Sequence, residues 1–333
     1  MKFITDFLNS GTVKQQNRKK LGALLICATA ALLVVALIGL AIFGIAGAIK
    51  NKNQEEESEE TGDKIPTGYV TTTFDEGTSS NGLLLLIDES HPYVGSAATV
   101  QPNSSLRVKT EGGEEIYKGA YGDINLTQET LDAFNQMMLA FHTANKDQEG
   151  YRLGSIWLAS HLNGLNAEMT PATKELLKTG CALIIENQYD EAAPSIYDVE
   201  AKTGKGVYKW IYDNAAKYGF VKVADSAAEG NVFRYVGVVH AKAMEDRKVA
   251  SFAEYLTYLQ TKTNLRSQLS VSVTGADGKA TKYSVYYLAS DVEHYVPEDG
   301  TFEYTVSGDN MGGYIVTVNK TTASKTNNTV KPA

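Results

Sequence analysis

The chain has 333 residues, of which 43% are hydrophobic, and this is enough to form one or two buried cores. Its formal net charge of -8 argues against nucleic-acid binding, because that function requires a basic surface. Two cysteines, Cys27 and Cys181, are too few for a disulfide framework, and we expect Cys181 to be a small buried apolar residue.

Residues 21–49 contain no charged side chain. Such a segment is long enough to cross the ~30 Å hydrocarbon core of a bilayer. Lysines and an arginine lie between positions 14 and 20, whereas glutamates dominate positions 55–60. Because positive charges flank the cytoplasmic side of a membrane helix, we expect residues 1–20 in the cytoplasm, a single transmembrane helix over residues 21–49, and the remaining chain outside the cell membrane. A cleaved signal peptide is the less favoured alternative, because the apolar run is long and no small-residue cleavage site ends it.

Residues 50–78 are acidic and rich in small polar residues, which predicts a flexible tether. We expect a compact domain over residues 79–262. It opens with Leu83–Ile87, a short apolar run that predicts a buried strand.

Three helices are predicted within this domain. An apolar stripe of helical period extends from Leu126 to Asn145, where Asn125 or Thr127 can cap the first turn. A second amphipathic pattern covers residues 204–218 and ends at a glycine. A capping box, Ser-x-x-Glu, opens a third helix at Phe252–Lys262.

After about residue 263 the sequence becomes rich in β-forming residues, with runs at 268–273, 283–288 and 314–318 separated by turn residues. This region, residues 263–320, is expected either to form a small accessory domain or to pack on the preceding core. Residues 321–333 are expected to be a disordered tail. Because helices and short strands interleave in the domain, the predicted fold class is α+β.

The most informative motif lies in two segments. Residues 210–220 read WIYDNAAKYGF, and residues 229–241 read EGNVFRYVGVVHA. These segments resemble the vancomycin-resistance-type zinc D-alanyl-D-alanine carboxypeptidases, the VanY-like peptidase family, in which Trp-x-x-x-Asn-Ala-x-x-Tyr-Gly-Phe precedes Glu-x-Trp-His-Phe-Arg-Tyr-Val-Gly-x-x-His-Ala. The resemblance covers roughly residues 82–260 and implies a D,D-carboxypeptidase-like mixed core.

The resemblance also assigns the zinc ligands of the family to positions in this chain. The His of the second motif is replaced by Val232, while Glu229 stands at the position of the catalytic base. Two further ligands of the family come from Ser-x-His-x-x-Gly-x-Ala-x-Asp, whose best match places Leu177 at the His and Ile184 at the Asp. Aliphatic side chains have no lone pair for a metal. The resemblance therefore implies a degenerate member that has lost the zinc cofactor and retains Glu229 as a vestigial residue.

A second register keeps a His, a Gly and an acid at similar intervals, with His161 and Glu168 as ligands. It lies further upstream of the Trp210 segment than the family spacing allows, and it leaves Val232 at the third ligand position. An active zinc D,D-carboxypeptidase with relocated ligands His161 and Glu168 is the alternative that this register keeps open.

Residues 150–152 are similar to the Gly-Tyr-Arg of the family, whose arginine faces the cleft near the substrate carboxylate. Tyr151, Arg152, Arg234 and His240 are therefore candidate ligand-binding residues. An arginine binds an anion bidentately, although a structural ion pair would explain each arginine equally well. If the cleft is kept for binding, Arg152, Glu229 and Arg234 should converge on one concavity.

We expect a single-pass cell-membrane protein whose external domain resembles D-alanyl-D-alanine carboxypeptidases but is catalytically inactive. Its expected ligand is a peptidoglycan stem peptide or a protein of the cell envelope, with no nucleic acid. The retained fold could also serve only as a platform for a protein partner.

Overall fold

The computed structural model describes residues 65–75, 77–119, 125–159, 169–187, 196, 206–224, 226, 229–275 and 277–321. These residues belong to a compact unit that starts at Ile65. The predicted cytoplasmic segment, transmembrane helix and tail from residue 322 lie outside them. Within the described ranges, no helix is long and apolar enough to span a membrane.

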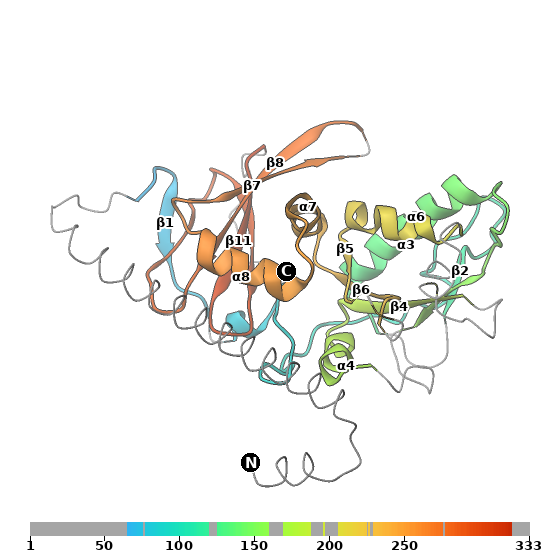
Figure 1. Ribbon diagram of the computed structural model, residues 1–333. Coiled ribbons are helices and arrows are strands. Elements are labelled where there is room, and N and C mark those ends of the chain that lie inside the picture. The colour runs from blue at the N-terminus through green and yellow to red at the C-terminus, as the bar shows by residue number, and fades with distance from the viewer. Residues whose placement is uncertain are drawn as a thin grey trace, which may run out of the picture. The chain divides into compact units, whose positions relative to one another are not determined.

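A five-stranded sheet with the order β2-β3-β4-β6-β5 forms the centre of the domain expected over residues 79–262. Its strands are β2 (Tyr117–Gly119), β3 (Ile156–Ala159), β4 (Ala182–Asn187), β5 (Phe220–Lys222) and β6 (Val232–Tyr235). Strands β2 and β3 are parallel, and the other neighbours are antiparallel. Helices α3 (Gln128–Asn145) and α6 (Lys209–Asn214) cover one face, and α4 (Pro171–Lys178) covers the other (Figure 1).

Alternation along the strands divides the core into two clusters. Leu183 and Phe233 belong to the large cluster that includes residues of α3 and α6, whereas Ile184 and Val232 belong to a smaller cluster that includes residues of α4. Successive side chains of a strand point to opposite faces of the sheet, so β4 and β6 each contribute to both clusters.

The helix starts follow from the caps that the sequence predicts. Thr127 Oγ1 accepts a hydrogen bond from the backbone N–H of Thr130 at 3.2 Å, and Ser251 Oγ accepts one from the N–H of Glu254 at 3.2 Å. These bonds confirm the capped starts of α3 and α8 (Phe252–Lys262). The second predicted helix is shorter than expected. Helix α6 is followed by a 3-10 helix, and the chain leaves it at Gly219, where φ is 85°.

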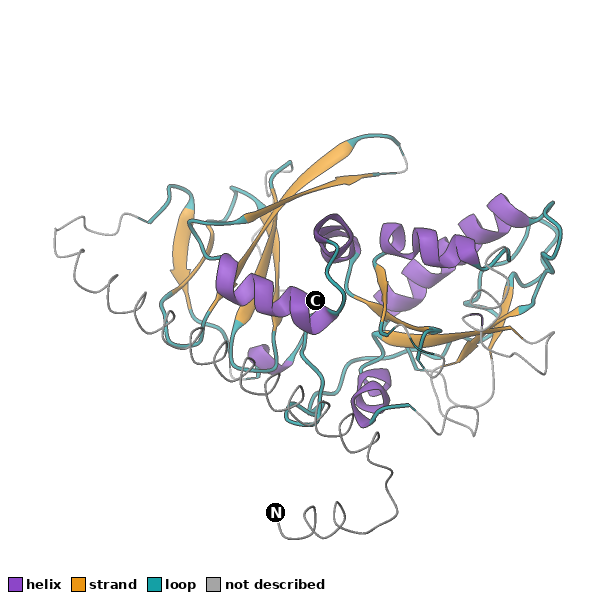
Figure 2. Ribbon diagram, in the orientation of Figure 1, coloured by secondary structure: helices purple, strands orange, loops and turns teal. Residues whose placement is uncertain are grey.

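The β-rich extension packs on the core around the five-stranded sheet. It contains a four-stranded antiparallel sheet with the order β10-β11-β8-β7 (Figure 2). The strands are β7 (Leu269–Thr274), β8 (Ala280–Leu288), β10 (Glu303–Gly308) and β11 (Tyr314–Asn319). Helix α7 (Val238–Arg247) contacts β7, and α8 contacts β8. Because Val271, Val285 and Ile315 belong to the same cluster as α3, the extension and the core share one interior.

The flexible tether was predicted over residues 50–78, but the last part of this range forms regular structure. Strand β1 (Tyr69–Thr72) pairs antiparallel with β9 (His294–Pro297), and the Tyr69 ring packs edge-on against Tyr286 with centroids 6.1 Å apart. A 3-10 helix follows at Thr78–Ser80. The β-branched and aromatic residues of β1 find a strand partner more than 200 positions away, which the local composition could not indicate.

The strand predicted at Leu83–Ile87 is wrong, although the segment is buried as expected. Its backbone is bonded to a turn and to side chains instead of to a neighbouring strand. The N–H of Leu84 donates to Ser307 Oγ at 2.9 Å, and the N–H of Leu86 donates to the carbonyl of Asp309 at 2.9 Å. The turn between β10 and β11 therefore holds this segment in place.

Candidate functional site

The three positions that the resemblance assigns to zinc ligands lie in one buried apolar cluster. Ile184 on β4 is the register partner of Val232 on β6, and Leu177 in the last turn of α4 belongs to the same cluster. The exposed fractions of Leu177, Ile184 and Val232 are 6%, 1% and 0%. The fold thus brings together residues that are 55 positions apart in sequence.

This cluster does not fit a zinc ion. Zinc is bound by nitrogen, sulfur or oxygen atoms, and the three side chains offer only hydrocarbon surface. Within the described part of the chain, no group of three or more His, Cys, Asp or Glu side chains could hold a metal. His161 and Glu168, the ligands of the alternative register, lie outside the described residues.

Glu229, at the position of the family's catalytic base, has a structural partner. Its Oε1 accepts a hydrogen bond from the backbone N–H of Thr170 at 2.6 Å, and its exposed fraction is 7%. Thr170 is the N-cap of α4. A carboxylate at this place compensates the partial positive charge of the helix start. Stabilisation of α4 explains the presence of Glu229 without any metal-activated water.

Arg234 is also held by the protein. One of its terminal nitrogens, Nη2, donates to the carbonyls of Leu83 at 2.8 Å and Leu85 at 2.7 Å. The Phe252 ring lies over the guanidinium, with 3.7 Å from Cζ to the ring centroid. Burial lowers the pKa of Arg234 to about 10. The Arg234 side chain therefore attaches the segment that contains Leu83 and Leu85 to strand β6.

Tyr151 and Arg152 lie in the turn between α3 and β3. The Tyr151 hydroxyl is 2.6 Å from Nδ1 of His142, and burial raises the pKa of Tyr151 to about 12. Arg152 is exposed, and its carbonyl accepts a hydrogen bond from the N–H of Ser155. The candidates expected to converge thus have separate partners: Glu229 binds the start of α4, Arg234 binds the segment before residue 86, and Arg152 lies in an exposed turn.

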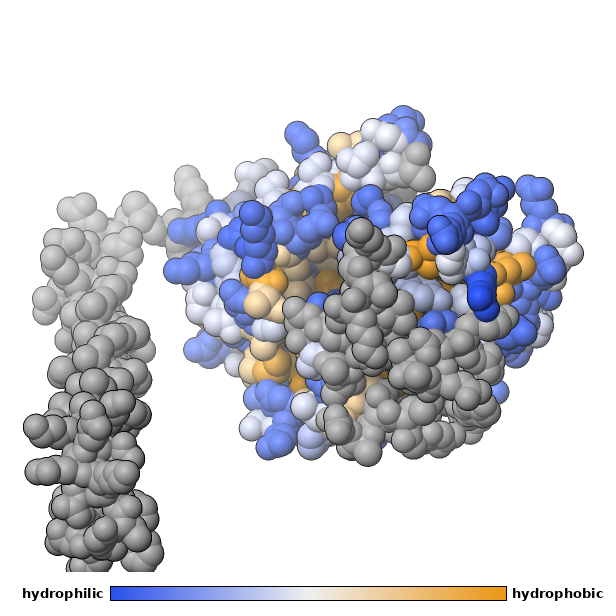
Figure 3. Space-filling view, turned by 45° about the vertical axis from the view of Figure 1, so that its right-hand side comes forward, coloured by the Kyte–Doolittle hydropathy of each residue, from blue (hydrophilic) through white to orange (hydrophobic). Residues whose placement is uncertain are grey.

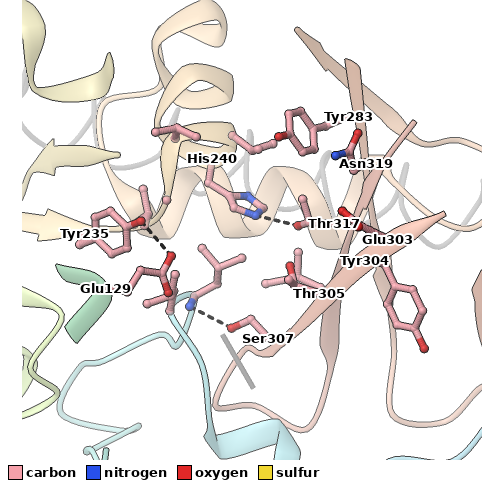
Figure 4. Close-up of a pocket in the computed structure, with 17 residues that line it drawn as sticks. Glu129, Tyr235, His240, Tyr283, Glu303, Tyr304, Thr305, Ser307, Thr317 and Asn319 are labelled. Carbon is pink, nitrogen blue, oxygen red and sulfur yellow. Dashed lines mark hydrogen bonds between the residues drawn. The ribbon is translucent and has the colours of Figure 1, made fainter. Parts of the chain in front are cut away.

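His240 lies in the wall of a cavity of about 510 Å³ between α7 and the C-terminal sheet (Figure 4). Its Nδ1 is 2.9 Å from the Tyr255 hydroxyl, and its Nε2 is 2.9 Å from Oγ1 of Thr317. Burial lowers the pKa of His240 to about 3. The imidazole is therefore neutral at physiological pH and connects α7, α8 and β11.

Polar residues face this cavity from two sides. On the sheet, Tyr283, Asn319 and Glu303 are register partners across β8, β11 and β10. On the opposite side, the Tyr235 hydroxyl donates to Oε1 of Glu129 at 2.9 Å (Figure 4). A volume of this size suits a small ligand. Sequence reasoning found only His240 among these residues, because the others come from five elements and form no motif.

Apolar side chains reach the visible face of the described residues only in small patches between hydrophilic ones (Figure 3). The large hydrophobic residues with well-exposed side chains include Ile65, Val94, Leu139, Val292 and Met311, which come from different parts of the chain.

The comparisons with known proteins agree with the motif. No family model matches the chain. Over 120 residues it is 32% identical to a D-alanyl-D-alanine carboxypeptidase of Enterococcus faecium, a match that spans 33% of this chain and 36% of the relative. The chain thus matches only about a third of the length of this curated relative.

Among solved structures, the vancomycin-resistance D,D-dipeptidase VanXYg, in complex with a D-Ala-D-Ala phosphinate analogue, superposes with a TM-score of 0.55. The identity is 16%, and the match covers 75% of this chain and 99% of VanXYg. The LD-carboxypeptidase LdcB, with 20% identity, covers 56% of this chain and 93% of its own with a TM-score of 0.36. The predicted resemblance is confirmed: this chain has the mixed fold of the D,D-peptidases and is similar to the VanY-like peptidase family.

Proposed function

We propose that this chain is a cell-envelope protein that binds a peptidoglycan stem peptide without zinc-dependent hydrolysis. The observation that carries the proposal is the apolar cluster of Leu177, Ile184 and Val232 at the positions of the family's metal ligands. The sequence similarity to a D-alanyl-D-alanine carboxypeptidase supports the class of ligand. The bond from Thr170 to Glu229 supports the loss of catalysis, because this carboxylate already has a structural partner.

The test combines binding, product analysis and metal content on the purified full-length chain. A stem peptide ending in D-Ala-D-Ala is titrated by calorimetry, and the same mixture is examined for free D-alanine by mass spectrometry. We expect binding, no D-alanine and less than about 0.1 zinc per chain by elemental analysis, since no lone pair is available at the three positions.

Three outcomes would contradict this proposal. D-Alanine release that disappears in Glu229→Gln, with about one zinc per chain, would favour the active peptidase, with His161 and Glu168 as the candidate relocated ligands. Release that persists in Glu229→Gln would indicate catalysis by other groups. If the stem peptide is neither bound nor shortened, the result would favour the hypothesis that the fold is a platform for a protein partner.

We also propose that residues 21–49 anchor the chain, with the N-terminus in the cytoplasm and the domain outside. The charge difference between positions 14–20 and 55–60 supports this orientation. A cysteine introduced at Gly62 should react with a membrane-impermeant maleimide on intact cells, after replacement of the native cysteines by alanine. Labelling only after lysis would reverse the orientation, and an unanchored chain in the soluble fraction would disprove the anchor.

A further inference from the structure

Strand β7 (Leu269–Thr274) is the last strand of the four-stranded sheet, and β8 is its one neighbour among the described strands. The β7–β8 hairpin projects beyond the rest of this sheet (Figure 1), because β11 ends opposite Tyr283 whereas β8 begins at Ala280. Sheet edges in natural proteins are usually protected by charged residues, proline or a bulge. Strand β7 reads LSVSVT, without charge or proline, and its pairing with β8 is continuous. The β7 edge is therefore open to a further strand.

This edge carries a row of unpaired backbone groups. Lys282, the register partner of Ser272, turns its N–H and carbonyl away from β7, and they bond to the two residues that follow β11 at 2.9 and 2.8 Å. In an antiparallel ladder, opposed residues turn their backbone groups alternately towards and away from each other. Ser270, Ser272 and Thr274 thus direct their N–H and carbonyl groups away from β8. In the part of the chain that the structure describes, these groups have no hydrogen-bond partner, and all three residues are exposed.

The sequence of the β7 edge is self-complementary. Residues 270–274 read SVSVT, which is nearly the same in both directions about Ser272. Two such strands paired antiparallel about Ser272 place Ser270 opposite Thr274, and Val271 opposite Val273. Hydroxyl side chains then meet hydroxyl side chains, and the half-buried Val273 gains an apolar neighbour. The outward-facing groups of the two strands would form about six backbone hydrogen bonds.

The molecule leaves room for a second strand beside the start of β7. A cavity of about 450 Å³ there is lined by the first residues of β7 and by residues of α7 and α8, among them Arg247 and Glu254. In the antiparallel pair, the β7 strand of the second copy ends at this place and its hairpin turn follows. The turn carries Asp277 and Lys279. The wall and the turn each carry both signs of charge, so they can meet without net repulsion.

We propose that the β7 edge joins two copies of this chain, whose four-stranded sheets then form one continuous antiparallel sheet about a twofold axis at Ser272. A twofold contact uses the same surface on both copies, as the near-palindromic strand requires. The edge itself is uncharged, which favours a second β7 strand over a strongly charged peptide. The inference does not depend on the ligand proposed above.

Cysteine linking tests the pairing and its register in the full-length chain, with Cys27 and Cys181 replaced by alanine. Ser272→Cys should form a linked dimer with a thiol reagent that spans about 6 Å, because opposed residues of this kind have Cα atoms about 5.5 Å apart. Ser270→Cys and Thr274→Cys should each stay largely unlinked, since the two identical cysteines would lie about 14 Å apart. An equal mixture of these two variants should form a linked heterodimer. Absence of a linked dimer in Ser272→Cys, or equal linking at all three positions, would overturn the proposal.

A charge exchange at position 272 gives a second test, in which the native cysteines are retained. Full-length chains with two different affinity tags are mixed, one tag is captured, and the other is detected. Ser272→Lys should capture itself about fivefold less than the unmodified chain does, and so should Ser272→Glu, because like charges would face each other at the axis. A mixture of Ser272→Lys with Ser272→Glu should restore the capture.

Neither charged variant should change the Tm by more than about 2 °C, because the Ser272 side chain is exposed and its backbone groups are not used within one copy. Capture that Ser272→Lys leaves unchanged, or that the mixture fails to restore, would overturn the proposal by showing that the copies do not meet at this strand. A chain that self-associates in neither test would also overturn it, and would leave the β7 edge to an extended segment of a different protein.

Discussion

Replacement of Asp309 by alanine is expected to lower the free energy of unfolding by about 3–5 kcal/mol. The carboxylate is fully buried in the turn between β10 and β11. Its Oδ1 accepts from the N–H groups of Met311 at 2.7 Å and Gly313 at 2.9 Å, and its Oδ2 accepts from the Tyr287 hydroxyl at 2.8 Å and Gln260 Nε2 at 3.2 Å. Alanine would leave four donors without this acceptor, of which the N–H of Gly313 is buried and the other three are partly buried.

The effect should extend beyond the turn, because the same turn holds the N-terminal segment of the domain. The Asp309 carbonyl accepts from the N–H of Leu86, and the Asn310 side chain donates to the Leu86 carbonyl at 3.0 Å. Chemical denaturation of the full-length chain measures the change. Asp309→Asn should cost less because it retains one acceptor oxygen, and Asp291→Ala, at an exposed position, should change the stability by less than about 0.5 kcal/mol. A loss of under 1 kcal/mol for Asp309→Ala would show that the turn does not depend on this carboxylate.

Acidification is expected to destabilise the protein through His240. Burial lowers the pKa of His240 from an ordinary value of 6.5 to about 3, because the desolvated imidazole resists protonation. The unfolded state binds the proton more readily than the folded state. The contribution to stability is therefore complete above pH 6.5 and is lost progressively as the pH falls towards 3. At about 1.4 kcal/mol for each pKa unit, the total loss is on the order of 4–5 kcal/mol.

The measurement is the free energy of unfolding at a series of pH values between 7 and 4. In His240→Gln the dependence on pH should be flatter by up to about 1.4 kcal/mol per pH unit, although the variant is less stable at pH 7. Tyr255→Phe is the matched control, because it removes the hydroxyl beside Nδ1 and keeps the imidazole. It should lower the stability while retaining the steep dependence on pH. Identical slopes in His240→Gln and the unmodified protein would contradict this role of His240.

The sequence by itself determined the features that depend on neighbouring residues. Thr127 and Ser251 stand directly before amphipathic segments, so their side chains cap α3 and α8 as predicted. Gly219 ends the Trp210 segment in a conformation that glycine adopts without strain. The motif over residues 210–241 likewise identified the related peptidases, because it is contiguous and its residue types can be compared position by position.

The tertiary structure decided everything that depends on distant partners. Arg234 and Glu229 both looked available for a ligand, but their polar groups contact backbone atoms about 150 and 59 positions away. The apolar run at Leu83–Ile87 is buried without being a strand, because its hydrogen-bond partners come from the far end of the domain. The sequence showed that Leu177, Ile184 and Val232 are aliphatic. Only the structure, in which β4 pairs with β6 and α4 packs against them, showed that these three side chains contact one apolar cluster. Local composition specifies how each segment can fold, whereas burial and hydrogen-bond partners are set by which segments the fold brings into contact.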